Sequence, residues 1–247
     1  MFIMNKRGQV TLFVVMAIIL VGGAFAIIYT QTDLFKKTET MNPEIAPIKT
    51  FIDNCLKSTA EDALIYIGHQ GGYYDLPKLS IDTYSYYFYN NKSMVPSVQK
   101  IESELSRYMA DMLPFCTQNF TNFTGFDINS NSKIVSKSII LSEKVRFDVD
   151  YPILIKKGAS AYRLSSFSAE IPSRLFTIYR VAQNFTSVQL EDPLSLCVSC
   201  LTNLMINNDF YINMENYDNN TVIFTITDNQ TLINQNSYEF IFANKYD

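Results

Sequence analysis

Cys197 and Cys200 are the residues of this sequence whose spacing most suggests chemistry. Two residues separate them, which is the spacing of redox-active dithiols, and they fall in a helix predicted to begin at Asp192-Pro193. A helix N-terminus stabilises a thiolate through its partial positive charge. Because the strand–motif–helix unit of a thioredoxin-type enzyme does not surround them, we interpret the pair first as a structural disulfide. Reduced thiols, a redox pair and metal ligands are the alternatives.

Cys55 and Cys116 complete the set of four cysteines, which allows three disulfide pairings. Cys55 falls in the middle of one predicted helix and Cys116 just beyond another, so a bridge between them would join the two helices. On the chain-entropy model, a closure over about sixty residues stabilises a fold by roughly 4 kcal/mol. Cys197 and Cys200 would then pair locally or stay reduced.

The remaining titratable residues do not group into a recognisable site. His69, the one histidine, falls at a predicted helix end, where a cation is favourable, and the spacing does not bring it to the cysteines as a zinc ligand. Asp148 and Asp150 share one face of a predicted strand, which we interpret as the solvated face. The sequence contains no nucleophile elbow, phosphate loop or dinucleotide fingerprint. We therefore expect no catalytic residue, metal or cofactor.

The composition is that of a folded, mildly acidic protein. Of 247 residues, 47% are hydrophobic and 18% charged, and the net charge is −4 with a pI of about 5.1. Nucleic-acid binding requires a clustered positive surface, so we expect no nucleic-acid partner.

The N-terminal segment is predicted to cross a membrane. Residues 10–29, from Val10 to Tyr29, carry no charge, and as a helix they would span about 30 Å, the thickness of the hydrocarbon core. A cleaved signal peptide would have a shorter apolar stretch and a small-x-small cleavage site. We therefore predict a single-pass anchor in the cell membrane, with a cleaved signal or a buried soluble helix as alternatives.

The predicted anchor divides the chain into four parts. These are a short cytoplasmic or cleaved leader (1–9), the transmembrane helix (10–29), a juxtamembrane linker (30–41) and an extracytoplasmic domain (42–247). The cysteines, the size of the domain and the Asn-x-Ser/Thr sequons favour an inside N-terminus and an outside C-terminal domain. The candidate glycosylation sites are Asn91, Asn119, Asn122, Asn184, Asn219 and Asn229.

The large domain is predicted to be α+β, with packed helices, antiparallel sheet and no βαβ crossover. Three- and four-residue apolar spacing predicts helices over residues 42–72, 96–114, 172–185 and 192–204, of which the first two pack together. Strands are predicted over residues 84–89, 133–141, 144–155, 159–170, 210–214, 221–227 and 238–243, with a turn at 228–229. Pro152 makes its strand an edge strand or a bulged one. The aromatic run 84–89 is assigned to core packing in preference to ligand stacking.

The segment Lys6-Arg7-Gly8-Gln9 before the apolar stretch resembles the class III signal of archaeal type IV pilins and archaellins. The resemblance implies that a prepilin peptidase cuts between Gly8 and Gln9 and that the apolar helix then packs into a filament core. Many such subunits carry Glu at the fifth mature position, where this chain has Phe13. Two prolines after the span would also interrupt a continuous stalk.

The chain as a whole is similar to uncharacterised membrane-anchored proteins of small-genome archaea. The similarity lies in residues 6–13, 51–72 and 95–116, the motif Cys197-Val198-Ser199-Cys200 and residues 240–245. It implies a membrane location and carries no activity that could be transferred.

We therefore expect a membrane-anchored cell-surface protein with a structural or adhesive role and no catalysis. Its expected partners are the lipid bilayer and other surface proteins or copies of itself. The first alternative is a type IV pilin-like filament subunit processed after Gly8. The second is an extracytoplasmic thiol–disulfide oxidoreductase that uses Cys197 and Cys200.

Overall fold

The computed structural model describes residue 16 and residues 42–193 and 196–246. The chain divides into two compact units, Met1–Pro43 and Glu44–Asp247. Apart from Met16, residues 1–41 lie outside the described residues. The leader, the transmembrane helix and the linker therefore stay predictions. Over the part of the chain that is described, no helix has both the length and the hydropathy of a membrane span.

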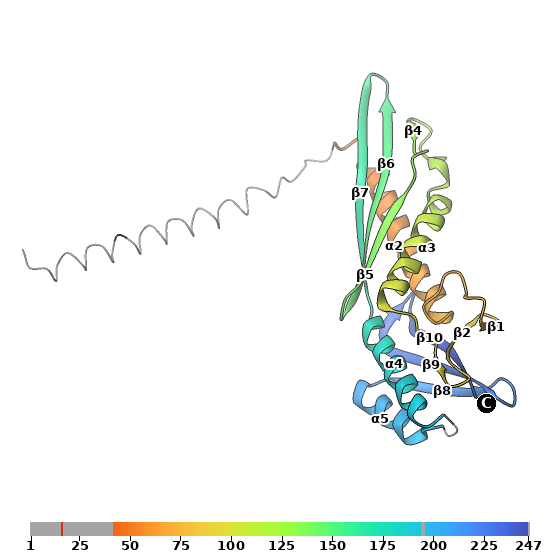
Figure 1. The fold of residues 1–247 in the computed structure, drawn as a ribbon. Helices are drawn as coiled ribbons and strands as arrows, with labels where there is room; N and C mark the ends of the chain where they lie inside the picture. Colours follow the sequence, from red (N-terminus) through yellow and green to blue (C-terminus); the bar gives the residue numbers. More distant parts are fainter. Residues whose placement is uncertain (1–15, 17–41, 194–195, 247) are drawn as a thin grey trace, which may run out of the picture. The chain divides into compact units, whose positions relative to one another are not determined.

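The unit Glu44–Asp247 is α+β, as predicted (Figure 1). Its α-helices are α2 (Ala46–His69), α3 (Val98–Thr117), α4 (Leu175–Glu191) and α5 (Val198–Asn208), and a short 3-10 helix, η1, covers Gln118–Phe120. Its strands are β1 (Ser80–Ile81), β2 (Tyr84–Tyr89), β3 (Lys92–Ser93), β4 (Asp127–Asn129), β5 (Val135–Ile140), β6 (Lys144–Lys157), β7 (Ser160–Pro172), β8 (Tyr211–Asn216), β9 (Thr221–Ile233) and β10 (Asn236–Lys245).

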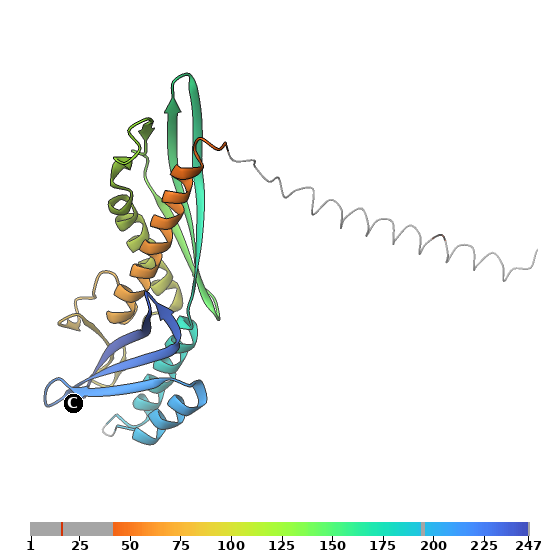
Figure 2. The same cartoon turned by 180° about the vertical axis from the view of Figure 1, so that it is seen from behind.

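The first sheet is antiparallel and is built around β6. β7 pairs along the whole of β6, while β5 and β4 pair with successive parts of its other edge. Alternate residues of β6 are buried from Val145 to Ile155, because α2 and α3 cover that face of the sheet (Figure 2). The predicted pairing of the first two helices is confirmed.

Pro152 lies in a bulge of a central strand. The register of β6 against β7 shifts between Asp150 and Ile153, where proline has no N–H to donate to the ladder. On the other edge, the same point falls between the end of the β5 pairing and the start of the β4 pairing. Of the two predicted possibilities, the bulge is therefore the one observed.

The second sheet is mixed, which corrects the prediction of antiparallel pairing alone. Its order is β1-β2-β10-β9-β8, and β2 runs parallel to β10. The two strands are far apart in the sequence, so the chain between them has ample length to return to the same end of the sheet. Local sequence patterns do not indicate that two distant strands will pair in parallel.

Several predicted helix boundaries were wrong. α3 continues past Pro114 to Thr117, so the helix tolerates the one hydrogen bond that the proline nitrogen cannot donate. α4 begins at Leu175, since Pro172 is still paired with Lys144 at the end of β7. α5 begins at Val198, and no helix starts at residues 192–193.

The predicted turn at residues 228–229 was also wrong, because β9 passes through it. The chain reverses instead at Asn234 and Gln235, whose φ angles are 51° and 67°. Asp228 is fully buried and receives a 3.1 Å hydrogen bond from Arg174 Nε. A polar residue typical of turns is thus held inside the sheet by a long-range ion pair.

Candidate functional site

All four cysteines are joined in two disulfides, Cys55–Cys116 and Cys197–Cys200. The first ties α2 to α3 across a sequence separation of 61 residues. The bridge between the helices and the local pairing are therefore both confirmed. Cys116, however, lies in the last turn of α3 and not beyond the helix.

The Cys197–Cys200 disulfide lies at the N-terminus of α5. This position would favour a thiolate in a thiol–disulfide exchange reaction. Cys197 is the N-cap, and its Sγ accepts a hydrogen bond from the backbone N–H of Cys200 at 3.3 Å. Both cysteines are partly exposed, and Val198 and Ser199 between them are exposed. A thiolate formed at Cys197 would keep this N–H donor and the favourable helix end.

The remaining titratable candidates are dispersed over the surface. Asp148 accepts hydrogen bonds from Arg146 Nε at 3.2 Å and Ser168 Oγ at 3.0 Å, on the outward face of β6, and Asp150 is exposed on the same face. His69 is the last residue of α2, with its Nε2 3.7 Å from Glu239 Oε2. Within residues 42–193 and 196–246, no three His, Cys, Asp or Glu side chains come together as metal ligands.

The predicted sequons are spread over separate elements of the unit. Asn119 lies in η1, and the other five asparagines are exposed: Asn91, Asn122, Asn184, Asn219 and Asn229. Exposure is necessary for glycosylation and does not test it, so modification at these positions stays a prediction.

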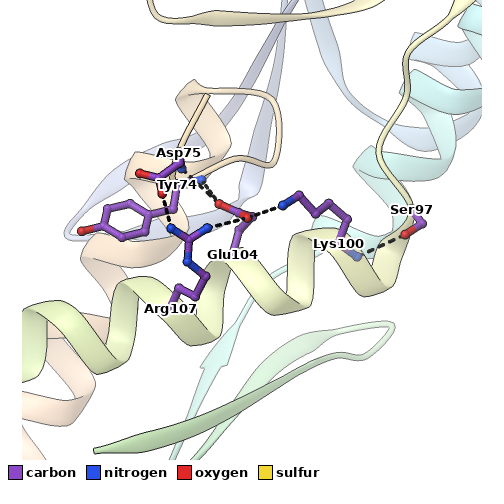
Figure 3. A network of polar contacts seen from close by, with 6 residues as sticks. All are labelled: Tyr74, Asp75, Ser97, Lys100, Glu104 and Arg107. Carbon is purple, nitrogen blue, oxygen red and sulfur yellow. Dashed lines mark hydrogen bonds and ion pairs between the residues drawn. The ribbon is translucent and has the colours of Figure 1, made fainter. Parts of the chain in front are cut away.

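The aromatic run of β2 is core, as the sequence indicated, since residues 85–88 are buried. The exposed aromatic site lies elsewhere, on α2, α3 and the loop that follows α2, and it depends on a buried carboxylate. Glu104 of α3 has no exposed side-chain surface, and its Oε2 accepts hydrogen bonds from the backbone N–H groups of Tyr74 and Asp75 at 2.9 and 3.0 Å (Figure 3). These bonds hold the loop against α3.

Two cations compensate the charge of Glu104 (Figure 3). Lys100 Nζ lies 2.6 Å and Arg107 Nη1 3.1 Å from Oε1, and Arg107 also pairs with Asp75. Burial raises the pKa of Glu104, but hydrogen bonds from Lys100 and from the two loop N–H groups outweigh it, so the net pKa lies below the ordinary value. The carboxylate is therefore held ionised.

The anchored loop places Tyr74 in a cluster with Tyr66 of α2 and Tyr108 of α3. The ring centroids are 5.9 Å apart for Tyr66–Tyr74, 5.4 Å for Tyr66–Tyr108 and 5.2 Å for Tyr74–Tyr108. The guanidinium group of Arg107 lies over the ring of Tyr74, 5.7 Å from its centroid. Tyr66 nevertheless stays 44% exposed. We call these three residues the tyrosine cluster.

Two hollows meet beside the tyrosine cluster. The first has a volume of about 430 Å³ and is lined by Asp62, Ile65, Tyr66, His69, Gln70, Thr83 and Tyr108. The second, of about 410 Å³, is lined by Ile65, His69, Ile233, Asn236, Ser237, Tyr238 and Glu239. They share Ile65 and His69 and therefore lie next to each other along the C-terminal end of α2; we call the two hollows together the depression. Both volumes lie in the range of small-molecule sites, roughly 300–1,000 Å³.

The close approach of β10 to α2 under the second hollow depends on Gly68. A Cβ there would lie 2.6 Å from the carbonyl oxygen of Glu239 and 2.7 Å from the hydroxyl of Tyr238. That hydroxyl is buried and, within the described part of the chain, has no hydrogen-bond partner. Burial raises the pKa of Tyr238 well above its ordinary value, so the phenol stays protonated.

The sequence did not identify this depression. Its residues come from α2, α3, the β1–β2 turn and the β9–β10 hairpin, and helical spacing assigns Tyr108 to an apolar face without reference to Tyr66. Comparison with protein families, with curated proteins and with solved structures found no match to this chain. The resemblances noted from the sequence remain predictions.

Proposed function

We propose that this chain is a membrane-anchored cell-surface protein whose unit Glu44–Asp247 has a structural or adhesive role outside the membrane. The observation that supports this most is the pairing of all four cysteines in two disulfides. Disulfides persist in oxidising compartments and are rare in a reducing cytosol. The uncharged segment from Val10 to Tyr29 supplies the expected anchor in the bilayer.

Thiol labelling on intact cells tests the location. Cells are treated with a membrane-impermeant reductant and then with an impermeant maleimide that adds mass. An outside domain takes up labels at the partly exposed Cys197 and Cys200 after reduction and none without it, whereas a cytoplasmic domain is labelled only after permeabilisation. The variant Cys197→Ser/Cys200→Ser is the matched control and should take up little label, because Cys55 of the remaining bridge is buried. Labelling that requires permeabilisation would refute the proposal.

A filament subunit is the first alternative, supported by the resemblance of residues 6–9 to a class III signal. Mass spectrometry of the native N-terminus decides the processing step. An N-terminus at Gln9 refutes the unprocessed anchor, whereas a chain that retains Gly8 refutes the processed subunit. Because processing alone does not prove assembly, electron microscopy of shed material is the second measurement.

A thiol–disulfide oxidoreductase is the other alternative, supported by the partly exposed disulfide at the N-terminus of α5. In this reaction a substrate thiolate attacks one sulfur of the disulfide. A mixed disulfide forms, and the other cysteine leaves as a thiolate. A measured reduction potential between about −120 and −270 mV, together with a thiol of depressed pKa, would favour this function. A more negative potential would favour a structural bridge.

A further inference from the structure

We propose that the depression beside the tyrosine cluster binds a neutral oligosaccharide. This inference rests on the proposed surface role and adds a ligand class to it. An adhesive protein needs a recognition site, and the described residues offer one that is concave, aromatic and polar.

The aromatic wall of the depression is a platform made by two neighbouring rings that are tilted relative to each other. The rings of Tyr66 and Tyr108 are adjacent, with centroids 5.4 Å apart and planes 41° apart, and both residues line the first hollow. A quaternary ammonium is held best by rings that enclose it. The apolar face of a sugar ring, by contrast, needs one aromatic surface to cover it.

The platform is rigid before any ligand arrives. Tyr74 makes T-shaped contacts with both rings, and its backbone N–H donates a hydrogen bond to the buried Glu104. A binding surface that is already ordered loses little conformational entropy on association. Tyr66 is therefore exposed to solvent and at the same time packed against Tyr74.

The polar lining matches hydroxyl groups and not anions. Asp62 offers carboxylate acceptors, Gln70 an amide with both donors and acceptors, and Thr83 a hydroxyl. Neither lysine nor arginine is among the residues that line the two hollows. A phosphate or sulfate ligand would require such a cation, whereas a neutral sugar requires mixed donors and acceptors.

The length of the depression indicates more than one sugar unit. Ile65 and His69 belong to both hollows, so a ligand stacked on Tyr66 can continue past His69 toward the second hollow. Asn236, Ser237 and Glu239 supply further hydrogen-bonding groups there. The unsatisfied hydroxyl of Tyr238 is a polar group that the fold leaves unpaired beneath this same half.

The test uses the full chain in a detergent without a sugar headgroup. Chitotriose, mannotriose and maltotriose are the probes, and binding is measured by saturation-transfer NMR and calorimetry. At least one trisaccharide is expected to bind saturably. Tyr66→Ala should lower its affinity about tenfold through loss of the stacking surface, while Tyr66→Phe should stay within about twofold.

Matched controls separate binding from folding. Tyr211→Ala removes a tyrosine that is 59% exposed on β8 and lines neither hollow, so it should leave the affinity unchanged. Asp62→Ala alters an exposed side chain of the first hollow and should weaken binding several-fold even if Tyr66→Ala proves unstable. Circular dichroism and thermal unfolding check each variant.

Three outcomes would overturn the inference. One is that none of the trisaccharides binds; another is that Tyr66→Ala and Asp62→Ala bind as well as the parent chain. The third is that tetramethylammonium binds and the sugars do not bind, and that Asp62→Asn abolishes the binding of tetramethylammonium. The binding measurements use purified protein, whereas thiol labelling uses intact cells. A negative result in one experiment therefore does not imply a negative result in the other. A surface domain without sugar binding is thereby distinguished from a protein that is not at the surface.

Discussion

The carboxylate of Glu104 accepts a hydrogen bond from the backbone N–H of Tyr74 at 2.9 Å, across a sequence separation of 30 residues. One buried side chain of α3 thereby fixes the loop after α2. Because Tyr74 supports Tyr66 and Tyr108, this bond connects the interior of the protein to the exposed aromatic platform.

Glu104→Gln should destabilise the unit by about 2–3 kcal/mol, because the charge-assisted bonds from Lys100 and Arg107 are lost. Urea unfolding of the full chain measures the change. Glu170→Gln is the control: its ion pair with Lys144 is exposed, and its loss should cost less than about 1 kcal/mol.

The same substitution should alter the acid limb of the stability profile. The pKa of Glu104 is lower in the folded than in the unfolded chain, so its contribution is complete above the unfolded pKa. It is lost as the pH falls through the folded pKa. Glu104→Gln should therefore lose less stability than the parent chain on acidification below about pH 4. If the free energies of unfolding of the variant and the parent chain fell in parallel with pH, the lowered pKa of Glu104 in the folded chain would be contradicted.

Cys55→Ala/Cys116→Ala should lower the free energy of unfolding by about 4 kcal/mol, because the disulfide closes a loop of 61 residues in the unfolded chain. Cys197→Ala/Cys200→Ala removes a bridge with a sequence separation of 3 and should cost less than half as much. Denaturant unfolding of both variants makes the comparison. Equal losses would show that loop closure is not the dominant effect.

Asp228→Ala should destabilise the unit by about 3–5 kcal/mol, since it leaves the largely buried Arg174 without its carboxylate. Asp228 also accepts a 2.6 Å hydrogen bond from Thr231 Oγ1. Thermal unfolding monitored by circular dichroism tests this. Lys144→Ala, in the exposed pair with Glu170, is the matched control and should have little effect. A similar melting temperature for both variants would refute the prediction.

Gly71→Ala should destabilise the unit by about 1–3 kcal/mol. Gly71 has a φ of +64°, and an added Cβ would lie 3.0 Å from the carbonyl oxygen of Ile241 and closer still to Ser85 Oγ. Gly125→Ala is the control, because nothing lies within 4 Å of a Cβ at that position. Chemical unfolding of the pair should show a loss for Gly71→Ala alone.

Local patterns were sufficient for most elements of the unit. The predicted first helix, the aromatic strand and the hairpin of β6 and β7 all appear, because the pattern that indicates each one lies within a short stretch of sequence. The periodicity of apolar side chains predicts which face of a helix or strand is buried. The position of a proline predicts where the hydrogen bonds between two strands are interrupted. The α+β class was predictable on the same grounds, whereas the bridge between α2 and α3 was one of three possible pairings that the structure decided.

The sequence by itself therefore determined the elements, the class of the fold and the apolar N-terminal segment. Only the tertiary structure decided that β2 lies parallel to β10, that Asp228 belongs in a strand and that Tyr66, Tyr74 and Tyr108 form one cluster. The physical reason is the range of the interactions. Periodicity and capping act over a few residues, whereas these arrangements depend on pairing and burial between segments that meet only when the chain has folded.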